Sequence, residues 1–242
     1  VRLTAGSRRI EFDTTVDWQE RHRFLKVAFP VAVRSQQAAF EIQHGYIHRP
    51  THDNTSWDRA RFEVCAHRWA DLSEPGYGVA LLNDCKYGYD VRGDTLRLSL
   101  LRGPGYPDPD ADRGSHRFAY ALLPHQGDLI AGRVVEEAEA FNLPLVVRHG
   151  VVPGGAGRIV SVDRVGVSIE ALKPADDGRG VILRICEVHG ARGPAAVTLH
   201  RPFASVERVD VLERVTGSVD HDGRTVRLDL RPFELVTLRF AG

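Results

Sequence analysis

The 242-residue sequence predicts an all-β protein made of a large antiparallel β-sandwich followed by a smaller β-sandwich. Short segments rich in Val, Ile, Leu, Phe and Thr recur along most of the chain, with Gly, Pro, Asp and Asn between them. Helical periodicity is confined to residues 133–140, where Glu and Ala are frequent. We therefore expect a large sandwich over residues 1–130, a connector with a short helix over 131–157, and a small C-terminal sandwich over 158–242.

The strands of the large sandwich are expected where apolar residues alternate with polar ones or form a short continuous run. Thr95–Leu101 shows the alternation, and Val79–Leu82 is an apolar run of the length of a buried strand. The expected strands are residues 2–4, 9–18, 23–33, 38–47, 61–66, 79–82, 95–101 and 117–122.

The C-terminal part contains shorter strands after the predicted helix, which ends at Asn142-Leu143-Pro144. A strand is expected at 145–149 and a Gly/Pro-rich loop at 150–157. Asp222-Gly223 is typical of a hairpin turn. Seven short strands indicate a small β-sandwich, at residues 167–173, 180–188, 195–200, 205–208, 219–221, 225–230 and 235–240.

Composition excludes several classes of function. The formal net charge is +0 and the pI is about 7.3, so nothing favours binding to nucleic acid or to an anionic membrane. No apolar run reaches the roughly 20 residues of a membrane helix. The three cysteines are odd in number and widely spaced, which argues against a disulfide framework and against a zinc finger. We therefore expect the chain to work in a reducing cytoplasm. The chain starts at Val1 and has no Met, so we expect it to be a fragment of a longer polypeptide.

The segment Asn83–Asp90 is the strongest candidate for ligand contact. It joins two acids, an amide, a lysine and two tyrosines around one glycine. Such groups hydrogen-bond hydroxyls, while tyrosine rings cover C–H surface, so the loop suits a polyhydroxylated ligand. The alternative is a tight turn in which Asn and Asp side chains bind nearby backbone and Gly supplies positive φ.

Two further motifs suggest metal sites, each with a simpler alternative. His44, His48 and His52 are four residues apart, but Pro50 argues against the helix that would place them on one face, and loop histidines are favoured. The acids of the loop after residue 103 resemble a calcium loop without its closing Glu, and a solvated surface loop is favoured. These acids are Asp108, Asp110 and Asp112.

Several long segments, taken together and in order, resemble the C-terminal β region of family 38 glycoside hydrolases, the α-mannosidases, in their bacterial and cytosolic/vacuolar branch. The resemblance is strong over residues 1–130 and weaker to residue 242. The segments are residues 15–22, 27–30, 49–58, 68–73, 78–90, 96–102, 107–112 and 120–125, including Arg-Pro-Thr-His, Asn-Asp-Cys-Lys-Tyr-Gly-Tyr-Asp and Tyr-Ala-Leu-Leu-Pro-His.

The resemblance implies a galactose-mutarotase-like supersandwich that belongs to a retaining exo-α-mannosidase of terminal α-mannosides. In this family an Asp nucleophile, an acid/base carboxylate and a zinc ion act in an N-terminal catalytic domain, expected before Val1. None of those residues maps here, so we assign this chain no catalytic residue, metal ligand or cofactor and expect it to be inactive alone. Its expected role is to pack on the catalytic barrel and shape the sugar site. The candidate substrate-binding residues are His52, Asn83, Asp84, Lys86 and Tyr87.

Two other functions stay open at this point. The chain could be a free-standing carbohydrate-binding or scaffold β-sandwich, or an enzyme similar to the aldose epimerases, which share the expected superfold. The sequence upstream of Val1 would discriminate, because only a mannosidase would carry a barrel with a His-x-Asp zinc pair. The expected partners are an α-mannoside glycan and the N-terminal catalytic domain, with a homo-oligomer as an open alternative.

Overall fold

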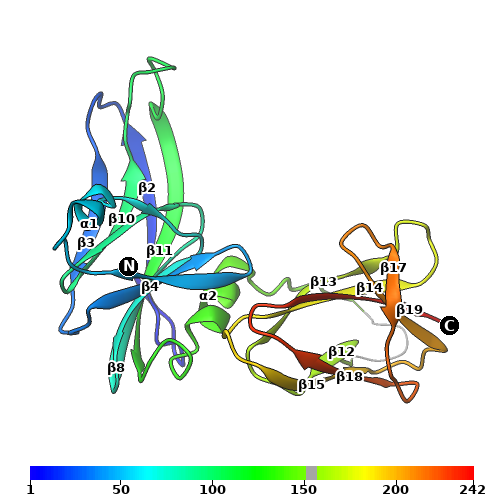
Figure 1. Cartoon of the computed structure of the whole chain (residues 1–242). Coiled ribbons are helices and arrows are strands. Elements are labelled where there is room, and N and C mark those ends of the chain that lie inside the picture. The colour runs from blue at the N-terminus through cyan, green and yellow to red at the C-terminus, as the bar shows by residue number, and fades with distance from the viewer. Residues whose placement is uncertain (151–156) are drawn as a thin grey trace. The chain divides into compact units, whose positions relative to one another are not determined.

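The computed structural model describes residues 1–150 and 157–242, which form two compact units, Val1–Val146 and Val147–Gly242 (Figure 1). Most of the Gly/Pro loop expected at 150–157 lies outside the described residues. Strands dominate both units and every strand pairing is antiparallel, which confirms the all-β prediction.

The first unit contains a seven-stranded sheet whose longest strand comes last in the chain. This strand, β11 (Gly114–Gln126), pairs on one side with β2 (Ile10–Trp18) and on the other with β8 (Tyr77–Asn83). Its register places Gly114 opposite Trp18, nearly a hundred residues away in sequence. The full order is β1 (Arg2–Leu3), β2, β11, β8, β7 (Trp69–Glu74), β4 (Gln37–Ile42) and β5 (Gly45–Pro50).

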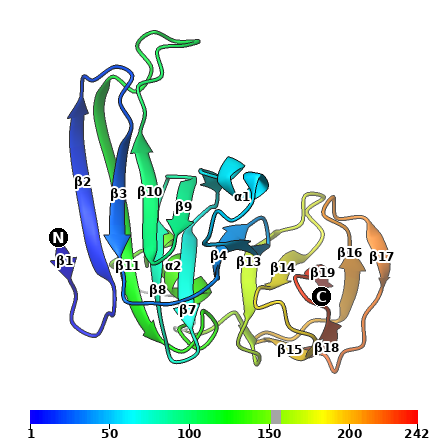
Figure 2. The same ribbon diagram turned by 60° about the vertical axis from the view of Figure 1, so that its left-hand side comes forward.

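A four-stranded sheet, formed by β3 (Leu25–Pro30), β10 (Thr95–Leu101), β9 (Gly88–Arg92) and β6 (Val64–Cys65), completes the first sandwich (Figure 2). Alternate residues of its strands point into one core with the seven-stranded sheet, because successive strand side chains face opposite ways. This core is apolar, and side chains such as Leu96, Leu98 and Phe118 are fully buried in it. The Phe12 and Tyr120 rings of one sheet pack near Phe29 of the other, with centroid distances of 5.6 and 6.2 Å to Phe29.

The outer face of the seven-stranded sheet is also covered. The helix α2 (Val134–Asn142) packs on β8 and β7 and buries Val134, Val135 and Ala138. Beneath this cover His125 Nε2 lies 2.8 Å from Asp71 Oδ1, and both side chains are buried. The helix predicted at 133–140 is therefore present, displaced by one residue at its start and two at its end.

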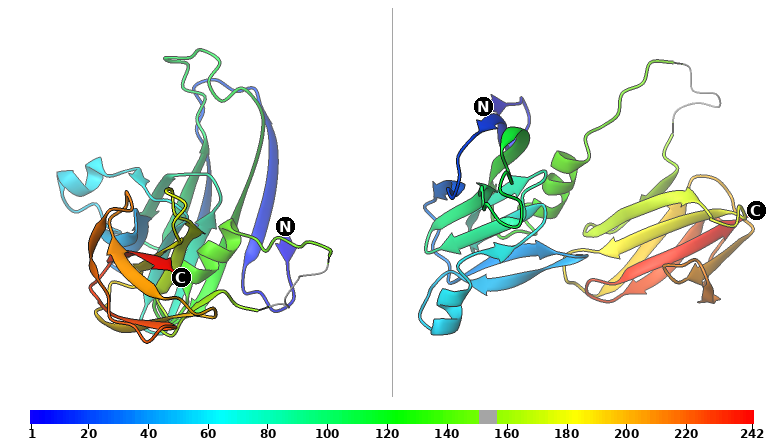
Figure 3. Two further views of the ribbon diagram at one scale, coloured as in Figure 1. Left: turned by 90° about the vertical axis from the view of Figure 1, so that its right-hand side faces the viewer. Right: turned by 90° about the horizontal axis from the view of Figure 1, so that it is seen from above.

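The second unit is a smaller sandwich of a three-stranded and a five-stranded sheet (Figure 3). Its core is formed by apolar residues of both sheets, including Leu183, Val197, Val226 and Leu238. One sheet has the order β12 (Val160–Val162), β15 (Gly193–Leu199), β18 (Thr225–Leu230); the other has β13 (Val167–Pro174), β14 (Val181–Glu187), β19 (Leu235–Ala241), β16 (Ser205–Val209), β17 (Val215–Ser218).

Several local expectations were wrong. The strand expected at 219–221 is not formed, since β17 ends at Ser218 and His221 makes only an isolated bridge to Val226. The strands β7 and β9 were not expected. Residues 38–47 are not one strand but the hairpin β4–β5, since His44 adopts positive φ (56°) and reverses the chain. Residues 145–149 form no strand, and their apolar side chains are exposed. The helix α1 (Ser56–Ala60) was not expected; Thr55 caps it, with Asp58 N–H donating to Thr55 Oγ1 at 3.1 Å and Thr55 N–H donating back to Asp58 Oδ2 at 3.1 Å.

Candidate functional site

The loop from Asn83 to Tyr87 is shorter than predicted, because β9 begins at Gly88. Asn83, at the end of β8, is 1% exposed and uses its whole amide inside the protein. Its Nδ2 donates to His67 O at 2.8 Å and to the Tyr89 hydroxyl, while its Oδ1 accepts from the backbone N–H of Cys85 at 2.9 Å and of Lys86. Asn83 therefore fixes the loop and has no group left for a ligand.

The other three predicted residues of the loop lie at the surface. The Asp84 carboxylate accepts the Ala119 N–H, with both oxygens at 3.0 Å, and so ties the loop to β11. The Lys86 ammonium lies 4.6 Å from the centre of the Phe118 ring. Tyr87 is 59% exposed, and its ring lies edge-on to His67. The loop thus presents one cation and one aromatic face from a rigid frame.

Asp84 also borders an open hollow of about 410 Å³ on the β2–β11 surface. Arg117 donates to Asp13 at 2.8 Å within it, and this hydrogen bond lowers the pKa of the Asp13 carboxyl. The volume is sufficient for a sugar ring, and charged groups of both signs can bind hydroxyls. Its lining consists of Arg2, Glu11, Asp13, Asp84, Arg117, Phe118, Ala119 and Phe141.

The Cys85 thiol shares this loop. Burial, together with its hydrogen bond to Asp84 and the negative charge of that carboxylate, raises the pKa of Cys85 to about 11. The thiol therefore stays protonated near neutral pH and is a poor nucleophile. Nothing in the loop supplies a catalytic thiolate.

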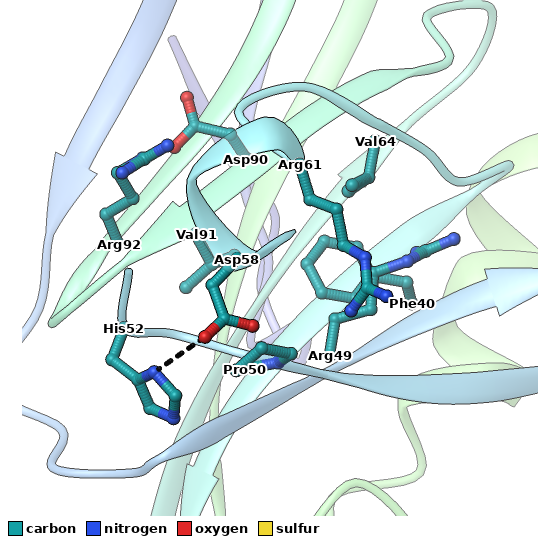
Figure 4. A pocket seen from close by; sticks show the side chains of 10 residues that line it. All are labelled: Phe40, Arg49, Pro50, His52, Asp58, Arg61, Val64, Asp90, Val91 and Arg92. Atoms are coloured by element: carbon teal, nitrogen blue, oxygen red, sulfur yellow. Dashed lines mark ion pairs between the residues drawn. The ribbon is translucent and has the colours of Figure 1, made fainter. Parts of the chain in front are cut away.

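His52 lies at a different hollow, shown in Figure 4, and not with the Asn83 loop. Its Nδ1 is 3.6 Å from Asp58 Oδ2, the residue that also completes the cap of α1. Arg49, from β5, and Arg61, just after α1, extend into the same hollow. Burial is the main cause that lowers the pKa of the Arg49 guanidinium; the Cys65 thiol opposes this, and the charge of Arg61 adds to it.

The described residues do not assemble a metal site. No group of three or more His, Cys, Asp or Glu side chains in residues 1–150 and 157–242 could hold a metal ion. His44 precedes the strand β5, which contains His48, and four residues along a strand span about 13 Å, too far for one ion. The described residues therefore offer no fitting site for the zinc ion, which the resemblance places in the N-terminal catalytic domain.

The three loop acids lie where the β10–β11 connection meets the β2–β3 connection. Asp112 accepts the backbone N–H of Arg102 at 2.8 Å and of Gly103 at 3.0 Å, and Asp110 pairs with Arg21 and Arg113. Asp108 accepts the Asp110 N–H at 2.9 Å, so two of the acids order the β10–β11 connection itself and only Asp110, through Arg21, ties it to the β2–β3 connection. Among the residues that the structure describes, no helix is long and apolar enough to cross a membrane.

Sequence reasoning named His52 of this hollow as a candidate but missed its two arginines, Arg49 and Arg61. The signal was present, because Arg49 opens the Arg-Pro-Thr-His segment and Thr55-x-x-Asp58 is a helix-capping pattern that places Arg61 one turn later. It was weak because arginine is the common cation throughout this chain.

Comparisons with known proteins match almost the whole chain. The family model described as glycosyl hydrolases family 38 C-terminal domain matches residues 1–110, and the family 38 C-terminal beta sandwich domain matches residues 166–238. Alpha-mannosidase 2C1 of Homo sapiens is 45% identical over 98% of this chain and 23% of its own length. An alpha-mannosidase of Saccharomyces cerevisiae is 37% identical over 96% of this chain and 24% of its own length.

The fold is also found in a solved structure. An alpha-mannosidase from Enterococcus faecalis V583 superposes with a TM-score of 0.79 at 19% identity, over 97% of this chain and 27% of that one. The chain thus spans about a quarter of the length of the relatives it matches. The two matching models and the level of identity show that this chain belongs to glycosyl hydrolase family 38, as the C-terminal β region of its α-mannosidases.

Proposed function

We propose that this chain is the non-catalytic C-terminal β region of a retaining exo-α-mannosidase that hydrolyses terminal α-mannosides. The observation that carries the proposal is the 45% identity over 98% of the chain to a protein named alpha-mannosidase 2C1. The catalytic carboxylates and a zinc ion that orients the sugar hydroxyls are assigned to an N-terminal catalytic domain of the same polypeptide. The setting we infer is the cytoplasm.

The β region's part in this activity is to orient the sugar and exclude water. The side-chain amide of Asn83 has hydrogen-bond partners within the protein for both its nitrogen and its oxygen, so it shapes the loop that carries the contact residues. Lys86 and Tyr87 are held by Phe118 and His67, and Asp84 borders the 410 Å³ hollow. We assign substrate contact to these three, and to His52 a contact with another part of the glycan. A group preorganised in this way contributes to orientation without taking part in bond cleavage.

Lys86→Ala and Asp84→Ala in the full-length enzyme test this role. We expect kcat/KM for an aryl α-mannoside to fall about 10–100-fold, or roughly 1.4–2.7 kcal/mol of transition-state binding. Melting temperature is measured on the same samples. Asp229→Ala, an exposed aspartate of the second sandwich, is the matched control and should leave both quantities unchanged.

If both loop variants melt at a lower temperature but keep an unchanged kcat/KM, the loop is only a structural turn and its residues do not contact the substrate. The membership of the family would survive that result. An inactive wild-type enzyme, with and without added zinc, would instead contradict the proposed reaction itself.

A further inference from the structure

The hollow that contains His52 closes one open edge of the first sandwich. The edge strands β5 and β6 belong to different sheets, and the segment between them, with α1, crosses this edge. Figure 4 shows Arg49 and Arg61 converging near the Phe40 ring from the two sides of the hollow. The Arg49 guanidinium carbon lies 4.9 Å from the centre of that ring.

Some charged groups around this hollow have a partner of opposite charge, and others do not. Arg92 pairs with Asp53 at 3.3 Å, and the Asp90 carboxylate is shared by Lys26 at 2.7 Å and Arg97 at 2.9 Å. Asp58 is used by the cap of α1 and by His52. Among the residues that the structure describes, Arg49 and Arg61 have no carboxylate within 4.0 Å.

Arg49 is the more buried of the two cations. Its Nη1 is buried and has no hydrogen-bond partner in the described part of the chain. A buried donor without an acceptor is unfavourable, and more so when it is charged. The positive charge of Arg61 adds repulsion. An acceptor that carried negative charge would relieve both penalties at once.

We propose that Arg49 and Arg61 form a binding site for an oxyanion, either a carboxylate or a phosphate. Guanidinium groups present paired N–H donors that match the spacing of carboxylate and phosphate oxygens. The enclosed space is about 20 Å³, which suits one water-sized group and is too small for a sugar ring. One oxygen of the anion occupies this space, and the rest stays at the mouth beside exposed Arg61 and His52.

The test titrates the 242-residue chain with inorganic phosphate, and separately with acetate, at constant ionic strength in a calorimeter. We expect one anion per chain. Arg61→Gln should raise the dissociation constant at least tenfold, because it removes the exposed half of the pair. Arg59→Gln is the matched control: Arg59 is an exposed arginine of α1 outside the hollow, and its substitution should leave binding unchanged.

Arg49→Met gives a readout that a purely structural arginine would not. Methionine keeps an apolar stem over Phe40 but removes the buried charge, so binding should disappear while the melting temperature without anion holds or rises. A lower melting temperature would mean that Arg49 is structural and would contradict the proposal. So would the absence of heat with both anions, or equal losses in Arg61→Gln and Arg59→Gln. Tighter binding of acetate assigns a carboxylate partner, and tighter binding of phosphate assigns a phosphate.

The site shares His52 with the proposed glycan contacts, but its two arginines have no part in the proposed reaction. It requires no turnover, and its failure would leave the mannosidase assignment untouched.

Discussion

The Asn83 loop and the Arg49–Arg61 hollow are both polar surface features of the first sandwich, but their hydrogen bonds are distributed in opposite ways. In the loop, every polar atom of the Asn83 amide has a partner within the protein. In the hollow, Arg49 Nη1 has none among the described residues. A dense polar sequence therefore does not by itself indicate a ligand site. A buried polar group that lacks a partner and also lines a hollow is a better indication, because burying it has a cost that a bound partner removes.

The largest effect expected from this comparison is on stability. Asn83→Ala removes four internal hydrogen bonds at a buried position and leaves the Cys85 and Lys86 N–H groups without their acceptor. We expect the free energy of unfolding to fall by about 3 kcal/mol, measured by urea denaturation. Asn54→Ala, at an exposed asparagine of the α1 approach, should change it by less than about 0.5 kcal/mol. Equal small effects would erase the distinction between the two regions.

A smaller, local effect is expected on the hollow side. Thr55→Ala removes the cap of α1, which buries no residue and depends on its caps for order. We expect a local loss of about 1 kcal/mol, or about five-fold faster amide exchange at Arg59 and Arg61, whose N–H groups bond to Thr55 O and Asp58 O. Ser56→Ala is the control. Unchanged exchange would show that α1 is held by something other than its cap.

The smallest effect concerns protonation and not packing. The pKa of the Cys85 thiol is raised to about 11, above its ordinary value of 9.0. Alkylation of Cys85 by iodoacetamide, followed by peptide mass spectrometry, should therefore show a midpoint near pH 11. Asp84→Asn should lower that midpoint, because it removes the negative charge.

The sign of the linked stability change follows from the same shift. Below about pH 9 the thiol is neutral in both folded and unfolded chains, so Cys85 adds no pH dependence to the stability there. Between pH 9 and 11 the unfolded chain releases its proton first, so this thiol lowers stability as pH rises. A midpoint near pH 9 in the folded protein would contradict the assigned environment.

Most of the fold could be predicted because its signals are local. The alternation of Thr95–Leu101 indicated the strand that the structure places at those residues, and the Glu/Ala run indicated α2. The hairpin at His44 was missed because nothing in Gln43-His44 resembles a Gly-containing turn. The roles within the site could not be predicted, since they depend on residues brought together by folding: Asn83 is saturated by Tyr89 and His67, and Arg49 meets Arg61 across a sandwich edge.

The position of β11 has a consequence for how this region must be synthesised. Residues 114–126 fill the gap between β2 and β8, so until they leave the ribosome both neighbours expose unpaired backbone edges. Closing a sheet over such a long sequence separation is slow, and open edges favour aggregation during that time. A shortened gene that stops at residue 110, where the first family model ends, would thus yield a chain in which β2 and β8 keep unpaired edges and which is prone to aggregate.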